Sequence, residues 1–81
     1  MLLEILTPEK KLFSGNVQGV QLPGVDGLFE ILDKHAPLVS ALGNGNVKVL
    51  QKGIAAATYA IQGGFVEVID NKATVLVEGV L

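Results

Sequence analysis

Hydrophobic and polar residues alternate in short segments along the chain, and turn-forming residues separate one segment from the next. The alternation is clearest over 46–51, where valines alternate with polar residues, and over 72–78, where Ala73 and two valines do the same. A period of two residues is typical of strands that bury one face. Turn signals such as 43–46 and 70–71 recur at short intervals. The pattern therefore predicts an all-β fold, a two-sheet β-sandwich of about nine or ten short strands.

One segment, Ile54–Ile61, contains four alanines and can also be interpreted as a helix. Eight residues between glycine-containing turns are short for a helix, and the neighbouring segments favour a strand. Gly63-Gly64 predicts a turn after it, and no linker or low-complexity stretch divides the chain, so we expect residues 1–81 to form one domain. The expected strands are Leu2–Leu6, Lys11–Phe13, Val17–Pro23, Leu28–Leu32, Leu38–Leu42, Asn46–Gln51, Ile54–Ile61, Phe65–Ile69 and Lys72–Glu78.

The small size of the chain limits how it can be stabilised. At 81 residues, 49% of them hydrophobic, the core supplies little surplus stability unless something else supports it. Cysteine is absent, which excludes disulfides and thiolate metal sites, and the single histidine, His35, cannot build a zinc site alone. We therefore expect neither a metal nor a cofactor, and a domain that depends on its apolar core and on association with partners.

Charge excludes another class of function. The net charge is −2, and the six basic residues are all lysines scattered along the chain. Nucleic-acid binding needs a basic stripe, preferably with arginines and stacking aromatics, so we expect no nucleic-acid partner. No run of about 20 apolar residues is present to span a membrane, and the first residues do not resemble a signal peptide. We therefore expect a soluble protein without direct membrane insertion.

Catalytic patterns are weak in this sequence. His35 is the one candidate base, and neither Ser14 nor Ser40 lies in a nucleophile elbow. The glycine-rich stretches 24–27 and 43–45 precede neither a helix nor a Gly-Lys-Ser/Thr sequence, as a phosphate-binding loop requires. Turn glycines and a loop histidine explain these residues better. We predict no catalytic site.

Lys72 supports an alternative interpretation. The stretch Asp70-Asn71-Lys72-Ala73-Thr74 lies at an expected hairpin and resembles the Asp-Lys-Ala hairpin of lipoyl carrier domains, which are all-β and of similar size. In those domains further strands follow the modified lysine, whereas Lys72 lies close to the end of this chain. A lipoyl- or biotinyl-type carrier domain with Lys72 as the attachment site is therefore the second hypothesis.

The segment Leu22–Ser40, which contains Pro23-Gly24-Val25-Asp26-Gly27 and His35-Ala36-Pro37-Leu38, resembles the epsilon subunit of F-type ATP synthase. Two further blocks agree with it in order and spacing. Leu3–Gly15 resembles the N-terminal strand pair of that family, and Gly63–Leu76 resembles its closing hairpin. Together the blocks cover essentially the whole chain. The pattern departs from the family at Leu28, where an acidic residue is common, and at Asp33-Lys34, where Pro-Gly is common.

The resemblance implies a β-sandwich in the central stalk that links the c-ring to the gamma subunit and the F1 head. Carried over by position, it implies a c-ring side at Val25, Asp26, Gly27 and Leu28. It implies a gamma side at His35, Ala36, Pro37, Leu38, Val39 and Ser40. An acidic c-ring contact at Leu28 is then replaced by an apolar one, or shifted to Asp26 or Glu30.

The same resemblance implies a role without catalysis: a rotor subunit of a proton-translocating complex, located peripherally at the cytoplasmic face of the bacterial inner membrane as part of the F1 sector. Most members of the family continue into a pair of C-terminal helices that regulates the motor and in some cases binds ATP. The 81 residues contain no counterpart of this pair, so we expect no nucleotide binding and no helical brake from them.

Overall fold

The computed structural model describes residues 1–81, and they form eight strands and no helix. No helix, therefore, is present that has the length and apolar character needed to cross a membrane. The strands are β1 (Leu2–Leu6), β2 (Lys11–Asn16), β3 (Gly19–Gly24), β4 (Gly27–Leu32), β5 (Leu38–Leu42), β6 (Gly45–Gln51), β7 (Ile54–Ile69) and β8 (Lys72–Val80).

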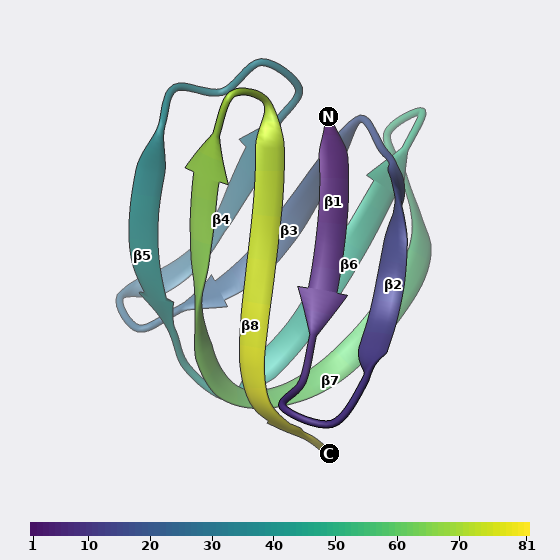
Figure 1. Ribbon diagram of the computed structural model, residues 1–81. Helices are drawn as coiled ribbons and strands as arrows, with labels where there is room; N and C mark the ends of the chain where they lie inside the picture. Colours follow the sequence, from purple (N-terminus) through teal and green to yellow (C-terminus); the bar gives the residue numbers. More distant parts are fainter.

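All strands belong to one hydrogen-bonded network that folds over into two layers (Figure 1). The strand order is β2-β1-β8-β7-β5-β3-β4, and β6 pairs with both β3 and β7. Most neighbours are antiparallel, but β1 runs parallel to β8. The long strand β7 joins the layers, because β6 pairs with its first half and β5 with its second half. The all-β sandwich predicted from the sequence is confirmed.

The strand count differs from the prediction because β7 is continuous. Gly63-Gly64, predicted as a turn, lies inside this strand and merges the two expected strands on either side of it. Both glycines have positive φ, +51° and +139°, and a Cβ on Gly64 would lie 2.1 Å from the carbonyl oxygen of Leu76. The pair therefore bends the strand and lets β8 approach closely, where ordinary residues would end the strand.

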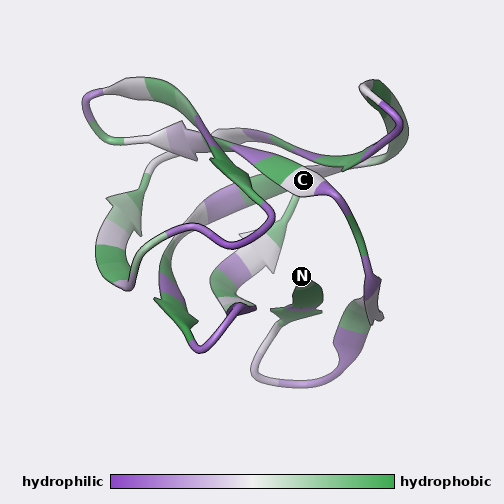
Figure 2. Cartoon of the chain, turned by 90° about the horizontal axis from the view of Figure 1, so that it is seen from above, coloured by the Kyte–Doolittle hydropathy of each residue, from purple (hydrophilic) through white to green (hydrophobic).

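The predicted alternation decides which side chains enter the core. Hydrophilic and hydrophobic segments alternate along the strands (Figure 2). In β8, Ala73, Val75 and Val77 are buried, and the residues between them face outward. All the buried side chains that build this core are hydrophobic, and none of the charged side chains is buried. The domain is therefore held together by one apolar cluster between the two layers, as expected for a small chain without disulfides.

Candidate partner-binding site

The two segments that the sequence assigned to partners lie at opposite ends of β4. The turn Val25-Asp26 precedes this strand, and the loop 33–37 follows it. Six residues of strand span about 17 Å from first to last Cα, so the turn Val25-Asp26 and the loop 33–37 are separated by most of the 22–27 Å extent of the molecule. The structure therefore does not merge them into one site, but it connects them through one strand.

The turn between β3 and β4 is a tight hairpin. Gly24 pairs with Gly27, which has φ +126°, and a Cβ on Gly24 would lie within 3 Å of the Phe29 ring. This packing fixes the hairpin base and leaves its tip projecting, with Val25 64% and Leu28 70% exposed. A partner that reaches this tip would meet two apolar side chains beside the carboxylate of Asp26.

Main-chain hydrogen bonds also connect the hairpin tip with the end of β5. Val25 N–H donates to the Ala41 carbonyl over 3.3 Å, and Gly43 N–H donates to the Pro23 carbonyl over 2.8 Å. These bonds connect the hairpin with the end of β5, the strand to which Val39 and Ser40 belong. The hairpin tip therefore lies near the Ser40 end of the second predicted segment, while the loop 33–37 lies at the other end of β4.

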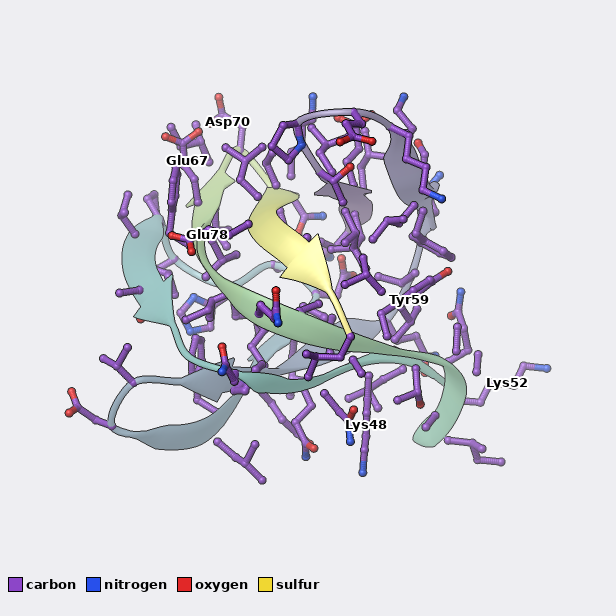
Figure 3. The ribbon with its side chains drawn as sticks, turned by 90° about the horizontal axis from the view of Figure 1, so that it is seen from below. Lys48, Lys52, Tyr59, Glu67, Asp70 and Glu78 are labelled. Atoms are coloured by element: carbon purple, nitrogen blue, oxygen red, sulfur yellow. The ribbon has the colours of Figure 1, made fainter.

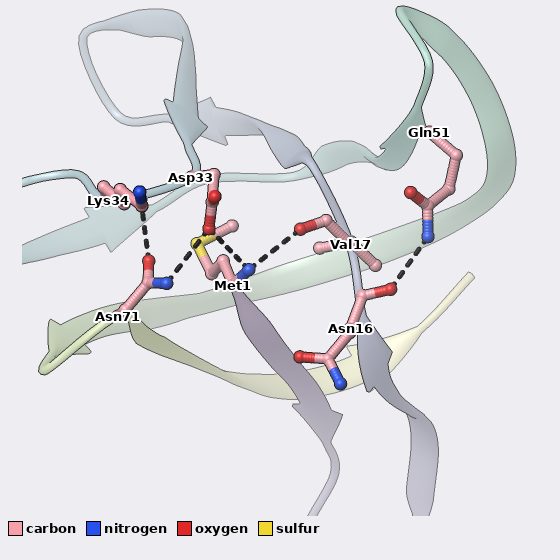
Figure 4. A network of polar contacts seen from close by, with 7 residues as sticks. All are labelled: Met1, Asn16, Val17, Asp33, Lys34, Gln51 and Asn71. Carbon is pink, nitrogen blue, oxygen red and sulfur yellow. Dashed lines mark hydrogen bonds and ion pairs between the residues drawn. The ribbon is translucent and has the colours of Figure 1, made fainter.

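A polar network sets the conformation of the loop before His35 (Figure 4). The Asn71 side-chain oxygen accepts a hydrogen bond from Lys34 N–H over 2.7 Å, and its amide group donates to Asp33 Oδ1 over 3.0 Å. The Met1 α-ammonium lies 2.6 Å from the same Asp33 oxygen and also donates to the Val17 carbonyl. Lys34 adopts φ +65° within this network, a left-handed conformation that residues other than glycine adopt rarely.

This network also changes the acidity of Asp33. The hydrogen bond from the Met1 α-ammonium, assisted by the one from Asn71, holds the pKa of the Asp33 carboxyl below its ordinary value. Three segments that are far apart in the sequence thus fix one loop. No sequence signal predicted this, because the hydrogen-bonding partners become neighbours only in the folded chain.

His35 itself is exposed. Its main-chain N–H donates to the Leu32 carbonyl over 3.1 Å, and its ring Nδ1 lies 2.7 Å from the Ala36 carbonyl oxygen. These contacts hold the ring against its own loop. Of the following residues, Ala36, Pro37 and Val39 are exposed, whereas Leu38 packs against the core. Leu38 therefore anchors the predicted gamma side to the core. Val39, 70% exposed, is the apolar side chain of this segment that is available to a partner.

Lys72, the second candidate, forms an ion pair. Its Nζ lies 3.3 Å from Glu4 Oε1, and Lys11 Nζ lies 3.1 Å from Glu4 Oε2. Hydrogen bonds from Lys11 and then Lys72 lower the pKa of Glu4. The three side chains link β2, β1 and β8 on the outer face of one layer, which gives Lys72 a structural role.

The remaining charges are spread over different faces. Glu67, Asp70 and Glu78 project from the β7–β8 side, and Lys48 and Lys52 project from the β6–β7 hairpin (Figure 3). No group of three or more potential metal ligands occurs, and the surface has no pocket. The features that stand out are therefore exposed loops and apolar strand residues rather than a concave site.

The fold and these surfaces define a small all-β sandwich domain with exposed apolar side chains on its turns and strands. A family model described as the β-sandwich domain of the ATP synthase delta/epsilon chain matches residues 1–81. The chain belongs to this family, and the resemblance seen in its sequence motifs is confirmed.

Relatives of known sequence agree with this membership. The chain is 47% identical over 78 residues to the ATP synthase epsilon chain of Chlorobium limicola, covering 96% of this chain and 89% of that protein. It is 43% identical over 88 residues to the epsilon chain of Salinibacter ruber, covering 96% of this chain and 58% of the relative.

Two mitochondrial ATP synthase structures contain chains with the same fold. In the central stalk and c-ring of Tetrahymena thermophila, the TM-score is 0.79 at 20% identity, covering 99% of this chain and 64% of that one. In the OSCP/F1/c-ring assembly of Euglena gracilis, the TM-score is 0.86 at 21% identity, covering 98% and 51%. The chain thus spans about half to two thirds of these larger neighbours.

Proposed function

We propose that this chain is a non-catalytic subunit of the central stalk of a bacterial ATP synthase. In this role it contacts the c-ring through Val25–Leu28 and the gamma subunit through His35–Ser40, so that rotation of the ring reaches gamma and the F1 head. It has no active site, binds no cofactor, and lies peripherally at the cytoplasmic face of the inner membrane. Its relatives are named as epsilon chains of this complex, which supports the assignment.

The observation that carries the mechanical part of the proposal is the position of the turn Val25-Asp26 and the loop 33–37 at opposite ends of β4. A coupling subunit must touch two partners at once and must not deform between them. β4 is hydrogen-bonded along its length to β3, and its Ile31 side chain lies in the core. Torque applied at the hairpin tip is therefore transmitted through a packed sheet rather than through a flexible connection.

Co-purification tests the proposal. The tagged chain, expressed in its source organism, is expected to recover gamma and the catalytic subunits of F1. Val39→Asp is expected to reduce recovery of gamma by about tenfold, because it places a charge in a contact that loses water on binding. Val80→Asp is the matched control: Val80 is also exposed on a strand, but it lies outside both predicted segments. Recovery of the tagged chain without gamma contradicts the proposed function.

A further inference from the structure

The α-ammonium of Met1 is buried and has hydrogen-bonding partners within the fold (Figure 4). Met1 is 8% exposed, and its side chain belongs to the core. Its nitrogen donates to the Val17 carbonyl over 3.1 Å and to Asp33 Oδ1 over 2.6 Å. A charge that is removed from water is costly unless it is paired and hydrogen-bonded, and this ammonium is both. It is therefore tied into the fold, unlike most chain termini.

The two bonds of this nitrogen use different hydrogens. Val17 N–H donates to the Met1 carbonyl over 2.8 Å, and the Met1 nitrogen donates to the Val17 carbonyl in return, so this pair extends the β1–β2 ladder beyond Leu2↔Asn16. One hydrogen of the ammonium is thus used as an ordinary strand N–H is used. The bond to Asp33 requires a second hydrogen, which an amide nitrogen does not have.

An acyl group on this nitrogen would remove the partner of Asp33. Acylation, such as formylation or acetylation, converts the ammonium into an amide that has no charge and a single hydrogen. The acyl carbon would lie about 1.3 Å from the nitrogen, in place of one of its hydrogens. The ladder bond to Val17 is compatible with an amide, so the ion pair with Asp33 is the contact that is lost.

Asn71 connects this ion pair with the loop 33–37. Asp33 Oδ1 also accepts a hydrogen bond from the Asn71 amide over 3.0 Å, and the Asn71 side-chain oxygen accepts the Lys34 N–H over 2.7 Å. Lys34 has φ +65°, a strained conformation that these bonds hold in place. Loss of the ammonium leaves Asp33 without its charged partner. The remaining bonds then no longer offset the strain at Lys34, and the loop opens.

We propose that the loop 33–37 closes only on a free α-ammonium at Met1, and that acylation of this nitrogen keeps the loop open. The α-amino group is then a modification site that controls a segment distant in the sequence. Hydrolysis reverses the modification: water breaks the acyl C–N bond, its oxygen stays on the acyl carbon as a carboxylate, and its two protons make the nitrogen an ammonium. Removal of an N-terminal acyl group is therefore the step that closes the loop. The requirement concerns this chain alone, whichever partner binds the loop.

Hydrogen exchange at the Lys34 amide tests the proposal. The full 81-residue chain is prepared with a free, a formylated or an acetylated Met1, and exchange is followed by NMR. Lys34 N–H is expected to exchange at least about tenfold faster in both acylated chains than in the free one, because its bond to Asn71 is released. Amides of the β6–β7 ladder are the internal control and should not change. Treatment of the formylated chain with a deformylase should restore slow exchange.

Two variants separate the ion pair from other effects of acylation. In Asp33→Ala the partner of the ammonium is absent, so acylation should change exchange of the Lys34 amide by less than about twofold. Asp70→Asn is the matched control, because Asp70 is an exposed carboxylate in the neighbouring turn and forms no hydrogen bond or ion pair through its side chain. Asparagine also tolerates the positive φ of this position. Acylation should keep its effect of at least about tenfold in this variant.

Urea denaturation shows which of these chains are folded. Equal exchange of the Lys34 amide in the free and acylated chains refutes the proposal. An acylation effect of the same size in Asp33→Ala also refutes it, because the cause would then lie in the packing of Met1. An effect of acetyl without one of formyl would make the size of the group the cause, and overturns it as well.

If acylation prevents folding of the wild-type chain, the variant still decides the matter. Folding of Asp33→Ala should then be the same with a free and an acylated Met1. Loss of folding on acylation of Asp33→Ala overturns the proposal.

Discussion

Gly64→Ala is expected to destabilise the domain much more than Gly27→Ala, although both glycines have φ values that other residues rarely adopt, +139° and +126°. At Gly27 an added Cβ would meet nothing within 4 Å, so the cost is backbone strain alone, about 2 kcal/mol. At Gly64 the Cβ would lie 2.1 Å from the Leu76 oxygen and 2.9 Å from Val77 Cα. Relief of this steric clash requires β7 and β8 to separate at Gly64.

Separation of the two strands would break about two ladder hydrogen bonds at about 1 kcal/mol each, which brings the total for Gly64→Ala to about 4 kcal/mol. A domain of this length has an unfolding free energy of about 4–12 kcal/mol, so the variant would lose a third or more of it. The assay is urea denaturation followed by far-UV circular dichroism. With a slope of about 1 kcal/mol/M, Gly27→Ala lowers the midpoint by about 2 M and Gly64→Ala by about 4 M, or it abolishes the transition. Equal losses at both positions would show that the approach of β8 to the bend carries no energetic cost.

Two further predictions concern the loop network and the core. Asp33→Asn is expected to lower the free energy of unfolding at neutral pH. Because the pKa of Asp33 is lowered by the Met1 α-ammonium, this stabilisation is present above the ordinary aspartate pKa of about 3.9 and is lost as the pH falls through the lowered value. Wild type and variant should therefore converge in acid, and a constant difference from pH 7 to pH 2 contradicts the ion pair. Ile61→Ala, at a fully buried site, is expected to cost about 3 kcal/mol in urea denaturation. Ile54→Ala, on the same strand but 70% exposed, should cost less than about 0.5 kcal/mol, and similar losses would contradict the assigned faces of β7.

The sequence predicted the location of the candidate segments but not how the fold presents them. Glycine and proline predicted the turn before β4 and the loop 33–37 after it, because these residues favour the backbone conformations of turns. The resemblance to the family, by contrast, assigned Val25–Leu28 and His35–Ser40 to partners. Neither showed that Leu38 packs against the core while Val39 is exposed. That distinction depends on which face of β5 lies against the opposite layer.

Alternation of apolar and polar residues determined by itself that the chain is all-β and, in β6 and β8, which residues are buried, because a strand places successive side chains on opposite faces. The tertiary structure alone decided three further features: the continuous bend of β7 at Gly63-Gly64, the loop held by Met1, Asp33 and Asn71, and the place of β4 at one end of the strand order. Each of them depends on which distant segments become neighbours. A local pattern does not encode that choice, since it is made by the packing of the whole core.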